Sequence, residues 1–186
     1  MLSSRDAVNI SIFAALYAIT SLLTAYIPTG PYFIQFRPAI AIPMIASILY
    51  APHIAGLSAA LGTFIASIVR YGTPILTIFS GTPANFACFY LMSLTFKYFR
   101  RRNINWIIAV IVSSLLGLYV GSVIIALGLW FLAVTLMPEL KLFASLTYAL
   151  KASFILVYAP APISILLTIW IVKMLEKSGK FPSKLK

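Results

Sequence analysis

The side chains that could perform acid–base or metal chemistry are few in this sequence. Among 186 residues, three are acidic and one is a histidine. Asp6 precedes the first apolar segment, Glu139 lies in a loop, and Glu176 lies near the end of the chain. Membrane phosphotransferases and metalloproteases need clustered carboxylates or histidines. We therefore expect no catalytic residue, no metal site and no cofactor.

Two further side chains, a histidine and a cysteine, are candidates for reactive groups. His53 stands beside Pro52 and could pair with Ser58, but no carboxylate nearby in the sequence would orient its ring. Cys88 is the only cysteine, so neither an intrachain disulfide nor a cysteine-based metal site can form. We interpret the histidine as a turn or interface residue and the cysteine as a small packing residue, and we expect no enzyme activity.

The groups that energise transport are also missing. No carboxylate lies within an apolar segment, whereas proton- and sodium-coupled transporters usually carry ionisable groups inside the membrane. The chain also has no glycine-rich loop ending in Gly-Lys-Ser or Gly-Lys-Thr, so it cannot hydrolyse ATP itself. If it moves a solute uphill, another subunit must supply the energy.

The composition predicts the elements that hold these side chains. The chain is 62% hydrophobic and 9% charged, where a soluble domain has roughly 25% charged residues. Apolar stretches near 20 residues recur, and each can cross a bilayer core roughly 30 Å thick. We predict an all-α integral membrane bundle of six transmembrane helices, forming a single domain over residues 1–186. The expected spans are about 7–27, 38–50, 53–69, 84–96, one from 104, and 150–172.

Two of these boundaries are open. The fourth span could begin near Ile75, with a break at Gly81-Thr82-Pro83. The apolar run from Ile104 to Met137 is too long for one straight span. We expect it to break near Gly121 or Gly128.

The basic residues predict the orientation. Most of them lie at the ends of apolar segments, as topology signals do, rather than on a face interleaved with aromatics, so the net charge of +11 does not indicate nucleic-acid binding. The positive-inside rule selects cytoplasmic N- and C-termini, with residues 173–186 as a basic cytoplasmic tail. This orientation places ten of the fourteen basic residues inside: Arg5, Lys97, Arg100, Arg101, Arg102, Lys173, Lys177, Lys180, Lys184 and Lys186.

Small residues recur at helical spacing in the first segment. Ala14 and Ala18 share one helix face, and Ser11 and Ala15 form a second pair. Small residues four apart allow another helix to approach closely in lipid. On this pattern alone, the pairs can serve packing within the chain or contact with a partner.

The stretch Ala14-Ala15-Leu16-Tyr17-Ala18 resembles the Ala-x-x-x-Ala signature on the first helix of the substrate-binding S components of energy-coupling factor (ECF) transporters. The features that follow are similar, in their order, to the first three helices of many S components. They are a proline-rich loop before Phe36-Arg37-Pro38, then Ile42-Pro43, Tyr50-Ala51-Pro52, and the small residues of 56–62. The resemblance covers the whole chain in architecture and mainly residues 10–90 in motifs.

This resemblance implies a multi-pass protein of the cell membrane that captures a vitamin or related micronutrient outside and delivers it inward. The energy would come from a membrane coupling protein and two cytoplasmic ATPases. By the same resemblance, Ala14 and Ala18 would contact the coupling protein, residues 28–37 would cover the pocket, and the fourth to sixth spans would line it. The residues alone leave two alternatives, a self-contained small permease or channel and a structural or assembly subunit of a larger membrane complex.

The resemblance to S components also implies a solute site that is a substrate-binding pocket on the outer side of the membrane. Arg37 and Lys151 could each anchor the chain at the lipid headgroups or bind an anionic group of the solute. Because Glu139 is the only anion expected in the outer half, we predict a neutral or anionic solute rather than a fixed cation such as thiamine. The candidate substrate-binding residues are Gln35, Arg37, Asn85, Tyr90, Tyr148, Lys151 and Tyr158.

Overall fold

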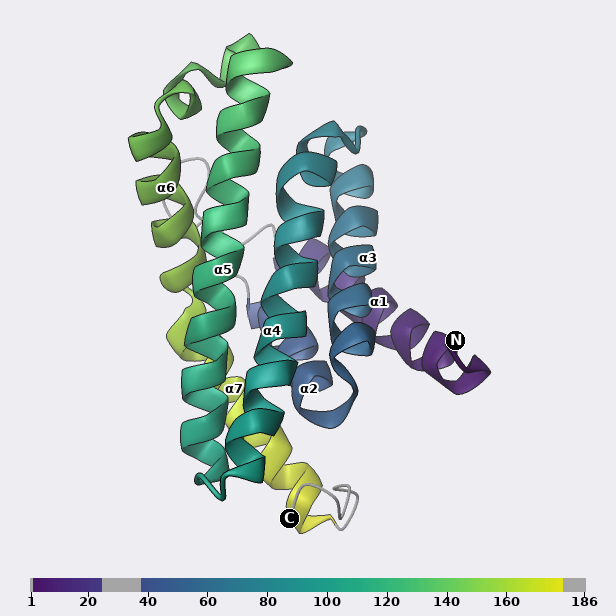
Figure 1. The fold of residues 1–186 in the computed structure, drawn as a ribbon. Coiled ribbons are helices and arrows are strands. Elements are labelled where there is room, and N and C mark those ends of the chain that lie inside the picture. The colour runs from purple at the N-terminus through teal and green to yellow at the C-terminus, as the bar shows by residue number, and fades with distance from the viewer. Residues whose placement is uncertain (1, 25–37, 179–186) are drawn as a thin grey trace.

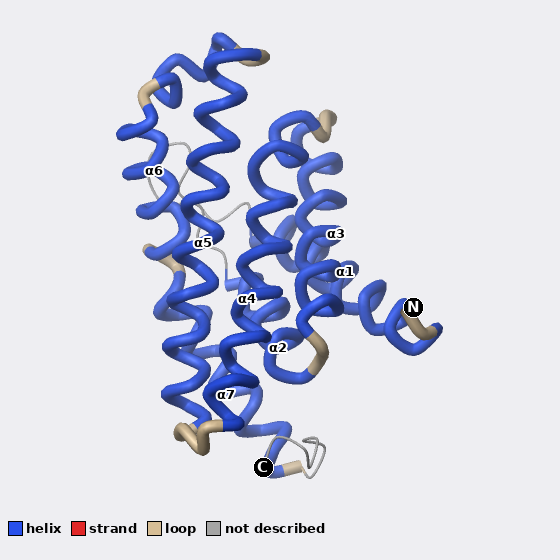
Figure 2. The backbone as a smooth tube through the Cα atoms, viewed as in Figure 1, coloured by secondary structure: helices blue, strands red, loops and turns tan. Residues whose placement is uncertain are grey.

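The computed structural model describes residues 2–24 and 38–178, and almost all of these residues are helical (Figure 1). None of the described residues forms a strand, as the tube in Figure 2 shows. The expected all-α fold is therefore confirmed. The elements are α1 (Ser4–Thr24), η1 (Pro38–Ile40), α2 (Ala41–Leu49), α3 (Pro52–Tyr71), η2 (Thr77–Gly81), α4 (Thr82–Arg101), α5 (Trp106–Thr135), η3 (Pro138–Ala144), α6 (Leu146–Tyr158) and α7 (Ala161–Lys177).

Local sequence explains where several helices begin and end. Helix α1 begins with a reciprocal cap, in which the Ser3 N–H donates to Asp6 Oδ2 (3.0 Å) and the Asp6 N–H donates to Ser3 Oγ (3.2 Å). Helix α3 begins at Pro52, whose missing N–H would be unbonded there anyway, and ends at Gly72 with φ 69°. Asn105 caps α5 by accepting a bond from the Ile107 N–H (2.9 Å).

Among the described residues, four helical stretches are long and apolar enough to cross a membrane: 4–24, 52–71, 106–135 and 146–177. The last is divided into α6 and α7 at Pro160. The stretch 38–49 is apolar but shorter, and α4 carries Lys97, Arg100 and Arg101 near its end. Six spans therefore stay a prediction, which depends on α2 and α4.

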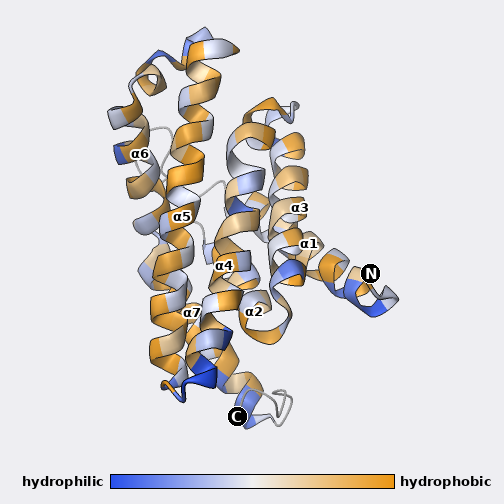
Figure 3. Ribbon diagram, viewed as in Figure 1, coloured by the Kyte–Doolittle hydropathy of each residue, from blue (hydrophilic) through white to orange (hydrophobic). Residues whose placement is uncertain are grey.

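Helix α4 lies between α3 and α5 in the centre of the bundle and runs antiparallel to both of them (Figure 1). Helix α1 crosses α3, α6 packs on the second half of α5, and α2 lies against α3, α4 and α7. Figure 3 shows hydrophilic residues gathered where α4 turns into α5 and at the C-terminal end of α7, with mostly apolar residues along the helices between. The basic residues at this end include Arg100, Arg101, Arg102, Lys173 and Lys177.

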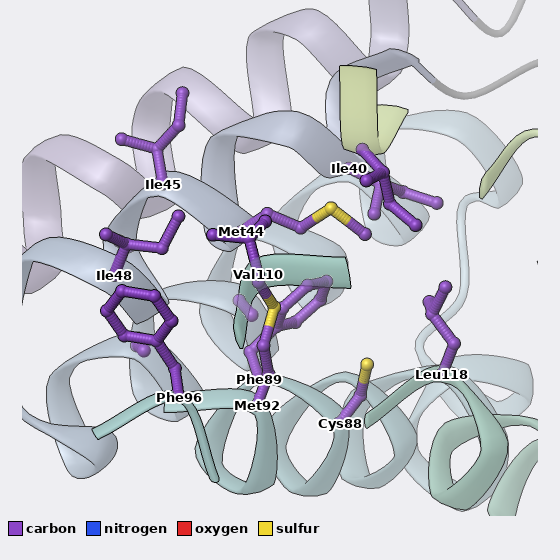
Figure 4. Close-up of a cluster of buried hydrophobic side chains, with 14 of the residues drawn as sticks. Ile40, Met44, Ile45, Ile48, Cys88, Phe89, Met92, Phe96, Val110 and Leu118 are labelled. Atoms are coloured by element: carbon purple, nitrogen blue, oxygen red, sulfur yellow. The ribbon is translucent and has the colours of Figure 1, made fainter. Parts of the chain in front are cut away.

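The tightly packed core occupies the half of the bundle near the α4–α5 turn. Met44 and Ile48 from α2 meet Phe89 and Phe96 from α4 and Val110 from α5 (Figure 4). These side chains are almost completely buried. Removing one of them would lose its transfer free energy and leave a void.

The prediction of a break in the long apolar run is wrong, because α5 is one continuous helix of 30 residues. Its glycines serve close packing instead. A Cβ atom on Gly117 would lie 2.6 Å from the Cys88 carbonyl oxygen, and one on Gly128 would lie 2.8 Å from Ser80 Cα. At 1.5 Å per residue the helix is about 45 Å long, so it must tilt or extend beyond the hydrocarbon core.

The predicted break at Gly81-Thr82-Pro83 is instead a π-helical turn, η2, that continues into α4, and the helical backbone begins at Ile75. Pro83 has no N–H to donate to the carbonyl of Phe79, four residues earlier. That carbonyl oxygen lies against Gly128 of α5. The wider turn and the glycine together allow the backbones of η2 and α5 to come into contact. Single π-helical turns of this kind are frequent at functional sites.

Candidate functional site

A cavity of about 250 Å³ lies in the half of the bundle opposite the tight core, at the end where α5 leads into α6 (top of Figure 1). Its walls come from α3, η2, the start of α4, the second half of α5, η3 and α6. The lining residues with polar side chains are Thr63, Ser67, Arg70, Tyr71, Thr77, Ser80, Asn85 and Ser153. The larger apolar residues are Leu76, Ile125, Leu129, Leu140, Phe143 and Leu156.

Helical spacing places the polar wall. Thr63, Ser67 and Arg70 are four and three residues apart, so they share the face of α3 that borders the cavity. Ile125 and Leu129 share a face of α5 in the same way. The cavity therefore has a polar side on α3 and an apolar side on α5.

Several of the polar groups are bonded within the protein. The Asn85 amide nitrogen donates to the Gly81 carbonyl (2.8 Å), and its amide oxygen accepts a bond from the Tyr17 hydroxyl (3.3 Å). The Ser80 hydroxyl donates to the Leu76 carbonyl (2.5 Å). Asn85 thus links α1 to α4, and its position on the cavity wall is held from both sides.

Two buried hydroxyls on the wall have no such bonds. Thr63 is 7% exposed and Ser153 is 1% exposed. Within the described part of the chain, neither Thr63 Oγ1 nor Ser153 Oγ has a hydrogen-bond partner. An unpaired buried hydroxyl costs about 1–3 kcal/mol, and native structures contain few of them. These two hydroxyls can therefore bond a polar group of a solute in the cavity.

The Ser153→Ala variant tests whether the Ser153 hydroxyl is unpaired, by its effect on stability. We expect the free energy of unfolding of the solute-free protein to stay level or rise by up to about 1 kcal/mol, because the variant removes an unpaired polar group. Ser47→Ala is the matched control, since the Ser47 hydroxyl is equally buried but lies 2.8 Å from the Pro43 carbonyl and 3.1 Å from the Phe89 carbonyl. It should lose about 1 kcal/mol. Denaturation in detergent measures both, and equal losses would mean that Ser153 has a partner.

Arg70 and Tyr71 lie at the rim of the cavity and are exposed. The guanidinium carbon of Arg70 lies 5.1 Å from the centre of the Tyr71 ring, within the range of a cation–π contact. None of the described residues that line the cavity is acidic. The rim therefore has a positive charge that no lining carboxylate neutralises.

Two smaller cavities adjoin the main one. One of about 30 Å³ reaches Tyr17 and Ser21 of α1, and one of about 50 Å³ reaches Tyr17, Cys88 and Leu118. The first shares Arg70 with the main cavity. The cavity of about 30 Å³ therefore lies in the same half as the main cavity, whereas the cavity of about 50 Å³ borders the core at Ile40, Phe89 and Leu118.

The predicted binding residues are distributed as follows. Asn85 lines the main cavity. Tyr90 is exposed and stacks on Phe86, with ring centres 5.7 Å apart. Gln35 and Arg37 lie outside the described residues.

The three predicted residues of α6 are not among those that line the cavity. Lys151 is exposed. Tyr148 packs its ring edge against Phe143, which does line it, at 5.5 Å. The Tyr158 hydroxyl donates to the Leu115 carbonyl of α5 (2.9 Å).

Sequence reasoning missed Thr63, Ser67, Arg70 and Ser153. The first three were detectable as polar residues on one face of an otherwise apolar helix. Ser153 could not be found in this way, because the residues three and four positions from it in α6 do not form a polar face with it.

The small residues of α1 divide between two faces. Ala14 and Ala18 are each 3% exposed and face α3, where a Cβ atom on Gly62 would lie 2.9 Å from the Ala14 carbonyl oxygen. Ser11 and Ala15 are exposed on another face. In this structure, therefore, α3 covers the pair that was predicted to contact a partner.

Comparison with protein families shows to which family this chain belongs. The family model described as the ECF transporter, substrate-specific component, matches residues 5–176. The chain belongs to this family. It is the substrate-binding subunit of an ECF transporter and is embedded in the membrane. S components bind small-molecule substrates and work with an ECF transmembrane and ATPase module, and the family is one of transporter components rather than enzymes.

The fold also matches a solved structure, that of the S component of a bacterial ECF transporter. The TM-score is 0.57 at 16% sequence identity, with 92% of this chain and 97% of the other covered. At this identity the match shows that the two chains share a fold. A comparison with curated proteins gives no match.

Proposed function

We propose that this S component captures a vitamin-like micronutrient from outside the cell in the cavity of about 250 Å³. The observation that supports this most is the cavity itself, which is several times larger than the two cavities of about 30 and 50 Å³ that adjoin it. Pockets for small molecules are concave and mostly apolar, with a few placed polar groups. The wall of Ile125, Leu129 and Phe143 with the hydroxyls of Thr63 and Ser153 fits that description.

The charge distribution supports an outward-facing cavity. The cluster of Arg100, Arg101 and Arg102 lies at the opposite end of α4 from the cavity. The positive-inside rule would place this cluster in the cytoplasm, with six spans and both termini inside. Gln35 and Arg37 are further proposed contacts of the solute, at the outer mouth.

The energy would come from a membrane coupling protein and two cytoplasmic ATPases. We place the contact with the coupling protein on the exposed face of α1 that contains Ser11 and Ala15. Small residues allow a partner helix to approach closely, and these two are accessible while Ala14 and Ala18 pack on α3.

Reconstitution in sealed vesicles tests this function. We expect the chain alone to bind a solute without accumulating it, because Asp6 and Glu176 lie in the end turns of their helices and no carboxylate lies in the middle of a span to couple an ion gradient. With the coupling protein and ATPases, uptake should depend on ATP. Mass spectrometry of small molecules released from the purified chain identifies the solute. Uphill accumulation by the chain alone would favour a permease, and the absence of any bound small molecule would favour an assembly subunit.

A further inference from the structure

We infer that the solute carries an anionic group, a carboxylate or a phosphate, which pairs with Arg70 at the rim while an apolar body fills the cavity below. This inference rests on the proposed function and narrows the class of substrate. It depends on three features of the described residues: the charge at the rim, the polarity of the walls, and the distance between the polar groups.

The positive charge at the rim of the cavity has no acidic residue near it among the described lining residues. The whole chain has three carboxylate side chains, Asp6, Glu139 and Glu176, and none of them is among the described residues that line the cavity. Arg70 lines both the main cavity and the cavity beside α1, and within the described part of the chain its guanidinium contacts an aromatic ring rather than a carboxylate. A guanidinium offers a planar fork of N–H donors that matches a carboxylate or a phosphate.

The walls of the cavity indicate the shape and polarity of the rest of the solute. Ile125, Leu129, Phe143 and Leu156 form an apolar side that suits a ring or a branched chain. Thr63 lies seven residues before Arg70 on α3, which corresponds to about 10 Å along the helix axis. Its unpaired hydroxyl is therefore well below the rim. The solute that satisfies both ends is elongated, with an anionic end, an apolar middle and a hydrogen-bonding group at the far end.

Matched probe pairs test the charge directly. The two members of each pair share one scaffold and differ in one end group, which is anionic in the first and neutral in the second. The pairs are nicotinate and nicotinamide, pantothenate and pantothenol, and biotin and biotinamide. Thiamine is added as a cationic probe. Titration calorimetry on the full chain in detergent, together with mass spectrometry of solutes released from the purified protein, measures which members bind. For any body that binds, we expect the anion to bind at least roughly tenfold more tightly than its neutral partner.

Variants then assign the preference to Arg70. Arg70→Gln should weaken binding of the anion by roughly ten- to a hundredfold and leave the neutral partner nearly unchanged, which removes the preference. Arg70→Lys should retain part of it. Lys141→Gln, an exposed cation that does not line the cavity, is the matched control and should have no effect. Thr63→Val should weaken both members of a pair alike, because it removes a bond to the far end.

The outcomes separate this inference from the proposed function. If a neutral or cationic solute binds best, or if Arg70→Gln leaves the preference for the anion intact, the inference is overturned and the binding function stands. If nothing is released from the purified protein and no probe binds, both are overturned.

Discussion

Gly128→Ala is expected to lower the free energy of unfolding by about 3 kcal/mol and to abolish solute binding, an effect at the upper end of what overpacking normally costs. The added Cβ atom would overlap the Phe79 carbonyl oxygen and lie 2.8 Å from the Phe79 carbonyl carbon and Ser80 Cα. These are backbone atoms, so no side-chain rotation can relieve the overlap. Helix α5 and η2 would have to separate.

The loss of binding follows from the position of η2. Thr77, Ser80 and Gly81 belong to this turn and line the cavity, as does Leu129 beside the substituted glycine. Moving the turn away from α5 therefore opens or reshapes the wall on both sides. Thermal unfolding in detergent and calorimetry with the solute measure the two effects separately.

Two other glycines serve as controls for this variant. Gly121→Ala should cost less, because its Cβ atom would lie 3.2 Å from the Cys88 side chain and 3.6 Å from the Ala84 carbonyl oxygen, which is an ordinary van der Waals distance. Gly72→Ala meets no atom within 4 Å but sits at φ 69°, so its cost should be about 1 kcal/mol from backbone conformation alone. Wild-type stability of Gly128→Ala would mean that η2 and α5 do not pack as described.

Ala15→Trp is expected to weaken association with the coupling protein by roughly a hundredfold while solute binding stays at the wild-type level, since a bulky ring blocks the close helix contact that small residues allow. Ala15 is exposed, and neither it nor Ser11 lines a described cavity. Copurification of tagged protein with the coupling protein, alongside calorimetry with the solute, measures the two properties in one preparation.

The choice of residue matters for this experiment. Ala14→Trp would place an indole against α3 next to Gly62, so the protein would lose stability and binding together. Leu166→Trp is the matched control, because Leu166 is an exposed apolar residue on α7, away from the face of α1. It should leave both properties unchanged. Normal copurification of Ala15→Trp would place the coupling contact on a different surface.

The unequal packing of the two halves bears on how the solute is held. Met44 and Phe96 in the core line none of the three cavities described above, whereas Thr63 lines two of them and Ser153 lines the one of about 250 Å³. Close-packed interiors transmit strain. We expect the packed half to act as a rigid base on which the walls of the cavity are positioned.

The class of the protein and most of its helices follow from the amino-acid sequence. A chain this apolar must satisfy its backbone hydrogen bonds within itself when it lies in lipid, which leaves helices as the structure for segments of this length. Pro52 and Gly72 mark the ends of α3 because proline lacks an N–H and glycine accepts a positive φ. The small-residue and proline motifs of the first three helices are enough to indicate the family.

The residues that share the cavity and the exposed face of α1 follow instead from how the helices pack against one another. Thr63, Asn85 and Ser153 come from three helices that are distant in the sequence, and no local pattern encodes their approach. Ala14 and Ala15 are neighbours, yet successive residues point about 100° apart around a helix, so a small-residue motif does not reveal which of them the rest of the chain covers. In the sequence, a glycine such as Gly128 is compatible with a helix break or with a close contact between helices. The contact is with the Phe79 carbonyl, which belongs to another helical segment, so the sequence around Gly128 does not reveal it.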